Sequence, residues 1–172
     1  LYASMPAGPD DSKLARAQVR AWADADGERI RVARRMYAWR LGEVLGSTQI
    51  DVLRGMEGAR AKETYRRLAE KYGIEWHGRR YDRNHPEGDD VPNQAINHAS
   101  TAVVAAGEVA VAVAGAVPQL GFIHEDSGIA FPLDVADLFR DSVTVSAAFA
   151  AASRVARGAT EPLERVVRRL VA

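Results

Sequence analysis

An apolar stretch between Asn93 and Val117 limits what this chain can fold into more than any other feature. It consists largely of alanine and valine, and its length approaches that of a membrane span. Polar residues interrupt it at Asn97, His98 and Glu108, so it contains no continuous apolar run of about 18 residues. We therefore expect a helix through the middle of a helical bundle rather than through lipid. His98 is then expected to be a core histidine with a hydrogen-bond partner, not a ligand.

The rest of the chain also predicts helices, and no clear strands or repeats interrupt them. Helical patterns cover residues 13–23, 28–41, 48–71, the segment from 132 onward, 141–157 and a last helix capped by Thr160. The 172 residues are enough for one domain with a core. We predict an all-α bundle around the apolar helix, spanning residues 12–172 after a linker-like segment at 1–11.

In two of these helices, the spacing of apolar residues predicts which face is buried. In the helix at 28–41 the spacing predicts an apolar stripe and an outward arginine face. The stripe is Ile30, Ala33, Tyr37 and Leu41, and the arginines are Arg29, Arg31, Arg34, Arg35 and Arg40. The expected apolar set of the helix at 48–71 is Ile50, Leu53, Met56, Ala59 and Leu68.

Composition excludes several classes of site. The chain has no cysteine, so a disulfide framework, a Cys-ligated zinc site and a thiol nucleophile are ruled out. Its first residues lack the basic and apolar regions of a signal peptide, and we expect a cytoplasmic protein. They also lack an initiator methionine, which suggests a piece of a longer chain.

The formal net charge of zero conceals a strong segregation of charge. Residues 29–83 hold 14 Lys or Arg against 7 Asp or Glu, whereas residues 84–137 hold 8 acidic residues and no Lys or Arg. This division favours a basic surface for a polyanion beside an acidic pocket for a cation. Solvated basic helix faces are the alternative explanation.

The chemistry is expected to centre on residues 120–137. His124 follows an apolar pair there, and Asp134 and Asp137 are spaced three apart, which places both carboxylates on one face of a helix. An imidazole and two carboxylates near apolar residues need partners. We predict that His124 and Asp137 bind a divalent metal, whereas Asp134 is explained equally well by the helix dipole.

Glu57 is the expected third ligand, from the helix at 48–71. It lies on the flank of the apolar stripe, and Gly55 and Gly58 bracket it. Glycine inside a helix costs about 1 kcal/mol relative to alanine. This pair therefore suggests that another backbone or a ligand approaches closely.

A long loop follows that helix, over residues 74–92. In it, Arg79, Arg80 and Tyr81 place two guanidinium groups and an aromatic ring together. This combination suits phosphate contacts and base stacking on nucleic acid. A purely structural role, with Tyr81 pinning the loop to the domain, is the alternative.

Five motifs in order resemble one known family. They are Arg54-Gly-Met-Glu-Gly-Ala-Arg60, Gly78-Arg-Arg-Tyr-Asp82, Asn93-Gln-Ala-Ile-Asn97, Gly121-Phe-Ile-His124 and Leu133-Asp-Val-Ala-Asp137. The chain is similar, over nearly its whole length, to the C-terminal helical domain of the CRISPR-associated endonuclease Cas1, the integrase of spacer acquisition. The E subtype of type I is the branch it resembles most.

The resemblance implies a Mg²⁺- or Mn²⁺-dependent enzyme that joins short DNA duplexes into a CRISPR array. Its metal ligands would be Glu57, His124 and Asp137, with Asp134 as an auxiliary carboxylate. Arg60, Arg79, Arg80 and Tyr81 would lie near the double-stranded DNA. The family also implies an N-terminal β-rich domain that mediates homodimerisation, and a small companion protein, Cas2. Because this chain lacks that domain, we expect it to be inactive by itself.

Two other functions are compatible with the same residues. In the first, a non-catalytic helical module binds nucleic acid or a protein, and Glu57, His124 and Asp137 form an ion-pair cluster with arginines. In the second, a metal-dependent hydrolase acts on a small phosphorylated substrate, and the apolar helix lines its pocket. Convergence of the three side chains on one point would favour an enzyme over the module.

Overall fold

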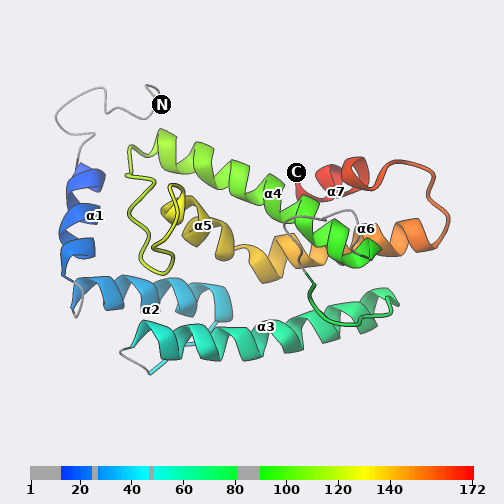
Figure 1. The fold of residues 1–172 in the computed structure, drawn as a ribbon, viewed down its shortest axis with the longest axis horizontal. Coiled ribbons are helices and arrows are strands. Elements are labelled where there is room, and N and C mark those ends of the chain that lie inside the picture. The colour runs from blue at the N-terminus through cyan, green and yellow to red at the C-terminus, as the bar shows by residue number, and fades with distance from the viewer. Residues whose placement is uncertain (1–12, 25–26, 47–48, 81–89) are drawn as a thin grey trace. The chain divides into compact units, whose positions relative to one another are not determined.

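The computed structural model describes residues 13–24, 27–46, 49–80 and 90–172. These residues form helices and no strand (Figure 1), which confirms the predicted all-α class. The helices are α1 (Lys13–Ala23), α2 (Glu28–Leu41), α3 (Ile50–Tyr72), α4 (Val91–Val113), α5 (Ala130–Asp137), the π-helical η3 (Arg140–Val145), α6 (Ser146–Ala156) and α7 (Leu163–Val171).

Local sequence signals explain where α2 begins and ends. The Asp24 carboxylate accepts hydrogen bonds from the backbone N–H groups of Gly27 and Glu28, both at 3.1 Å. Such bonds satisfy N–H groups that a helix start leaves without partners. At the other end, Gly42 adopts a left-handed φ of 72° and donates its N–H to Ala38. A glycine adopts this conformation without strain, so α2 has the bounds that its sequence predicts.

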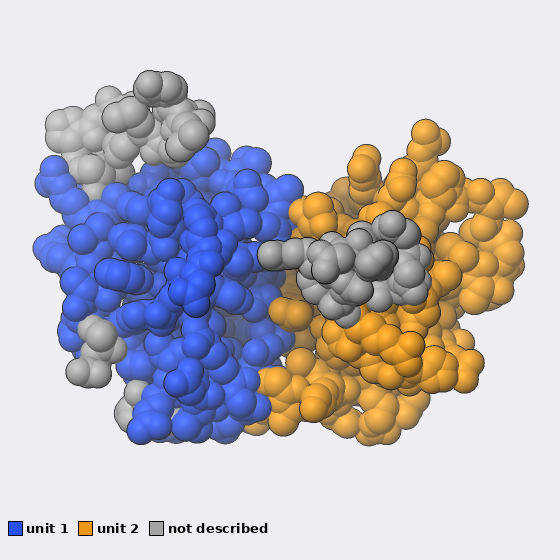
Figure 2. Space-filling model, in the orientation of Figure 1, with its two compact units in different colours: residues 1–57, 104–138 blue, residues 58–103, 139–172 orange. Residues whose placement is uncertain are grey.

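The contacts between residues divide the chain into two compact units, coloured separately in Figure 2. Unit 1 comprises residues 1–57 and 104–138, and unit 2 comprises residues 58–103 and 139–172. Both α3 and α4 contribute residues to each unit.

α4 is the apolar helix that the sequence predicts. Among the described helices it is the one with the length and composition to cross a membrane, and 28% of its most apolar window is buried. Its buried face follows helical spacing through Ile96, Ala99 and Val103 to Val111, whereas Val113 is 82% exposed. α4 thus supplies core residues to both units along one face.

Unit 2 has an aromatic centre. Phe149 of α6 is fully buried, and its ring centroid lies 5.1 Å from that of Trp76 and 6.5 Å from that of Tyr65. Ile96 of α4 and Val166 of α7 belong to the same core. These contacts join the segment after α3 to the two last helices of the chain.

Unit 1 has a smaller core, where α2 packs beside the first turns of α3 (Figure 1). Its fully or nearly buried members are Ala33, Tyr37, Leu45, Leu53 and Ile123. The backbones of α4 and α5 approach closely at Gly107, where a Cβ atom would lie 2.9 Å from the carbonyl oxygen of Pro132. A side chain at this position would push α5 away from α4.

The structure corrects several details of the sequence predictions. His98 is exposed on α4 and is not a core histidine. Met56 and Ala59 are exposed as well, whereas Tyr65 and Ala69, which were not in the expected apolar set, are buried. The first turns of the predicted helix at 141–157 are π-helical. The last helix begins after Pro162, so Thr160 does not cap it.

Candidate metal centre

Asp134 organises the segment that carries His124. Its carboxylate is fully buried in unit 1. It accepts backbone hydrogen bonds from Phe122 at 2.5 Å, Ile123 at 3.1 Å and His124 at 2.9 Å. A carboxylate buried without water is stable only when such donors surround it. Three consecutive N–H groups pointing at one side chain therefore fix the path of this segment.

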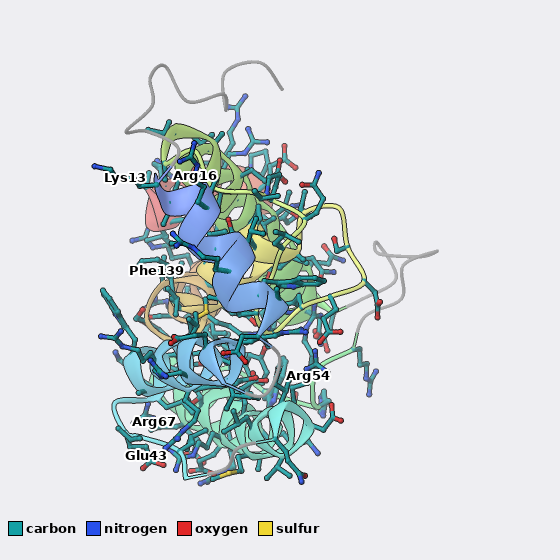
Figure 3. The ribbon with its side chains drawn as sticks, turned by 90° about the vertical axis from the view of Figure 1, so that its left-hand side faces the viewer. Lys13, Arg16, Glu43, Arg54, Arg67 and Phe139 are labelled. Atoms are coloured by element: carbon teal, nitrogen blue, oxygen red, sulfur yellow. The ribbon has the colours of Figure 1, made fainter. Side chains whose placement is uncertain are left out.

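Two arginines hold the carbonyl side of the same segment. Arg29 donates from Nε to the carbonyl oxygen of Phe122 at 3.4 Å and also pairs with Glu125. Arg54, labelled in Figure 3, donates from α3 to the carbonyl oxygen of Ile123. Gly121 precedes the segment, and a Cβ atom there would lie 2.3 Å from the carbonyl oxygen of His124. Both the N–H groups and the carbonyl groups of this segment are thus hydrogen-bonded to side chains from helices of unit 1.

The imidazole of His124 lies between two carboxylates. Its Nδ1 is 2.7 Å from Oδ1 of Asp134, and its Nε2 is 4.0 Å from Oδ2 of Asp137. The hydrogen bond to Asp134 raises the pKa of His124 above its ordinary value, burial opposes this rise, and the charges of both aspartates add to it. Because a carboxylate accepts from Nδ1–H, the neutral ring keeps its lone pair on Nε2, the nitrogen that faces Asp137.

Glu57 and Asp137 meet at the guanidinium group of Arg40. Nη1 of Arg40 lies 2.8 Å from Oε1 of Glu57 and 3.9 Å from Oδ2 of Asp137. The Arg40 side chain is only 3% exposed, and those of Glu57 and Asp137 are 20% and 23% exposed. The expected outward position of Arg40 is therefore wrong. Arg40 follows the buried Tyr37 by three residues and lies on the same side of α2.

Tyr37 adds a buried hydroxyl near these charges. Burial raises the pKa of Tyr37 to about 12, and the negative charges of Glu57 and Asp137 add to the rise while Arg54 and Arg40 oppose it. Its hydroxyl oxygen has no hydrogen-bond partner among the described residues.

The structure places Glu57, His124 and Asp137 in unit 1, where Arg40 lies between Glu57 and Asp137 and His124 lies 4.0 Å from Asp137. That the three bind a common metal stays a prediction. Asp134 is neither a first-turn residue stabilised by the helix dipole nor an exposed carboxylate, because it is the buried anchor of the His124 segment. The expected close approach at Gly55 and Gly58 is not found, since a Cβ atom at either would meet nothing within 4 Å among the described residues.

The residues expected near DNA belong to unit 2. Arg79 donates to Oδ1 of Asn93 at 3.0 Å and to Oδ1 of Asn97 at 2.6 Å, and the backbone N–H of Arg80 also donates to Asn93. Asn93 is fully buried at the start of α4 and fixes this turn, whereas the side chain of Arg80 is exposed. Arg60 lies on α3, and Tyr81 falls outside the described residues.

The donor chemistry of the unit 1 cluster fits a divalent metal such as Mg²⁺ or Mn²⁺. Two carboxylates and an imidazole nitrogen are suitable ligands. A carboxylate bonded to the second ring nitrogen is the usual support of a metal-binding histidine, and Asp134 has that position. No three His, Asp or Glu side chains in the described part of the chain form a ready-made ligand set, which agrees with the place of Arg40 between the two carboxylates.

Comparison with known proteins gives one consistent result. The family model of the CRISPR associated protein Cas1 matches residues 10–160. The chain is 40% identical over 143 residues to a CRISPR-associated endonuclease Cas1 of Rhodospirillum rubrum, an alignment with 81% of this chain and 46% of that protein. It is 37% identical to the corresponding Escherichia coli K12 endonuclease over 156 residues, which cover 90% of this chain and 50% of that protein.

A solved structure agrees with these relatives. The crystal structure of a TtCas1–DNA complex matches with a TM-score of 0.82 and 33% identity, and the match covers 93% of this chain and 58% of that one. The chain thus spans about half the length of the curated relatives it matches. By the extent of the family match and the agreement in fold, this chain belongs to the Cas1 family of CRISPR-associated proteins.

Proposed function

We propose that this chain is the C-terminal helical, catalytic part of a metal-dependent DNA endonuclease and integrase of CRISPR adaptation, in the E subtype of type I. The observation that carries the proposal is the meeting of Glu57, Asp137 and His124 Nε2 in one unit. The names of the relatives support nuclease chemistry, since they are called CRISPR-associated endonucleases.

Each residue of the cluster has a chemical role in this proposal. Glu57, Asp137 and Nε2 of His124 would hold Mg²⁺ or Mn²⁺. A metal held there would polarise the scissile phosphodiester and stabilise the charge that develops on its oxygens. Asp134 keeps the imidazole in the tautomer that leaves Nε2 free to bind, and it fixes the backbone on which the ring stands. The ligands are thereby held in place before DNA arrives.

The proposed substrate is double-stranded DNA, and the nucleophile in integration is a DNA 3′-hydroxyl. A neighbour of known structure was crystallised as a Cas1–DNA complex, which supports duplex binding. We propose that Arg80 contacts phosphate directly, and that Arg79 holds the turn through Asn93 and Asn97. Arg60 and Tyr81 complete the proposed contact surface.

We also propose the setting of the reaction from the family resemblance. The protein acts in the cytoplasm as a homodimer together with Cas2. Dimerisation is assigned to a β-rich N-terminal domain, so assays of the proposed activity use the protein at its full natural length.

The test of the proposed function is strand transfer of a short duplex into a supercoiled plasmid. With Mn²⁺ or Mg²⁺, the full-length protein and Cas2 are expected to give joined products on a gel, whereas excess EDTA lowers the reaction to background. The Glu108→Gln variant is a suitable control, because Glu108 is exposed on α4. Full activity in EDTA would refute a metal mechanism, and no joining or cleavage under any condition would favour a binding module.

The proposed phosphate contact predicts a specific change in salt dependence. The Arg80→Ala variant is expected to bind duplex DNA more weakly and to lower the slope of log K against log salt by about one for each phosphate that the protein no longer neutralises. Fluorescence anisotropy at several salt concentrations measures this slope. The Arg66→Ala variant is the control, since Arg66 already pairs with Glu63 and Glu70. An unaltered slope in Arg80→Ala would remove Arg80 from the DNA surface.

A second candidate function is the non-catalytic module. The ion pair between Arg40 and Glu57 favours it, because a guanidinium between carboxylates also satisfies a purely structural cluster. That function predicts DNA binding without any need for a divalent metal. The EDTA comparison above separates the two functions.

A further inference from the structure

Arg40 brings a positive charge into the centre of the acidic cluster. Its side chain is 3% exposed, and Nη1 lies 2.8 Å from Glu57 and 3.9 Å from Asp137. An arginine on a helix surface normally keeps its charged end in water. Here the end of α2 instead delivers a guanidinium to the two carboxylates that come from α3 and α5.

The two carboxylates need this charge when no other cation is present. Like charges that share a partly buried site repel each other and favour the uncharged forms. The buried guanidinium of Arg40 offsets this repulsion by its charge and also pairs with Oε1 of Glu57 at 2.8 Å. Without Arg40, the side chains of Glu57 and Asp137 would be expected to move apart.

The same charge works against a divalent ion. The ion and Nη1 of Arg40 would compete for the same oxygen atoms, since Oε1 of Glu57 already accepts from Arg40. A positive charge that remains about 5 Å from a divalent ion also repels it, by an amount that corresponds to about a tenfold or larger change in affinity even at high dielectric constant.

We infer that Arg40 is a built-in counter-cation that holds Glu57 and Asp137 in position before the metal binds and that lowers the affinity of the site for the metal. Arg40 is therefore a positioning residue and not a metal ligand. This inference rests on the metal site of the proposed function. One buried arginine would thus determine both how well the site is ordered without metal and how strongly the site binds metal.

The test measures Mn²⁺ binding by calorimetry and the thermal midpoint by circular dichroism, on the full-length protein. In EDTA, the Arg40→Gln variant is expected to melt below the wild type. It is also expected to bind Mn²⁺ about tenfold or more tightly than the wild type does, and to gain more in thermal midpoint when Mn²⁺ is added. The control is Arg35→Gln, which removes an exposed arginine from the same helix and should match the wild type in both measurements.

The possible results separate this inference from the proposed function. If the wild type binds Mn²⁺ and Arg40→Gln binds it equally or more weakly, the role of Arg40 is wrong and the metal site stands. If the wild type binds no Mn²⁺, the metal site fails and the inference fails with it. If Arg40→Gln does not fold in EDTA, refolding in Mn²⁺ is expected to restore it, and failure of that rescue overturns the inference.

Discussion

Replacing His124 by alanine is expected to abolish metal-dependent strand transfer, a loss of at least about 1,000-fold, because residues that act as one catalytic group fail together. The variant removes Nε2, the ring atom that faces Asp137 at 4.0 Å. It should leave the fold intact, since the side chain is 38% exposed and the backbone bond from His124 to Asp134 remains. Initial rates of joining, measured with saturating Mn²⁺ and DNA, give the comparison.

The chain offers a matched control for this experiment. His98 is exposed on α4, so His98→Ala removes an imidazole without touching the cluster and should retain wild-type activity. Circular dichroism spectra of both variants are expected to show that the helices are kept. Strand transfer by His124→Ala at the wild-type rate would exclude this imidazole from the reaction.

Replacing Asp134 by asparagine is expected to lower the free energy of unfolding by about 3 kcal/mol, because a buried carboxylate with several hydrogen bonds is replaced by a group that cannot accept them all. Asparagine keeps one acceptor oxygen, so either the N–H groups of Phe122 and Ile123 or the N–H and ring of His124 face an NH2 group that cannot accept. Urea unfolding measures the loss. Faster amide hydrogen exchange at residues 122–124 would locate it, and Asp126→Asn, which changes an exposed aspartate, is the control.

The pH dependence of this effect follows from the pKa of His124. Asp134 is the largest cause of the rise of this pKa above its ordinary value of 6.5, so in Asp134→Asn the pKa should move down, as a histidine NMR titration would show. A raised folded-state pKa adds stability below about 6.5 that is lost as the pH rises through the folded-state value. The stability difference between wild type and variant should therefore be larger at pH 6 than at pH 9. An equal stability difference at pH 6 and pH 9 would mean that the charge of His124 contributes nothing to the free energy of unfolding.

Two members of the proposed metal ligand set carried a local signal in the sequence, because His124 follows an apolar pair and Asp137 shares a helix face with Asp134. The signal for Glu57 failed, since nothing approaches Gly55 or Gly58 closely among the described residues. Arg40 carried no such signal of its own among five arginines in the same helix. Only contacts with α3 and α5, which lie far from it in sequence, bury its guanidinium.

The sequence by itself determined the helical class and the bounds of the first two helices, because periodicity and residues such as Asp24 and Gly42 act over a few neighbouring residues. It did not determine which polar residues would be buried. His98 is exposed and Asp134 is buried because burial depends on what distant segments place against each face. Tertiary structure alone decided that three backbone N–H groups meet Asp134 and that Arg40 lies between two acids. Both arrangements depend on electrostatic partners brought together by folding, which no local pattern encodes.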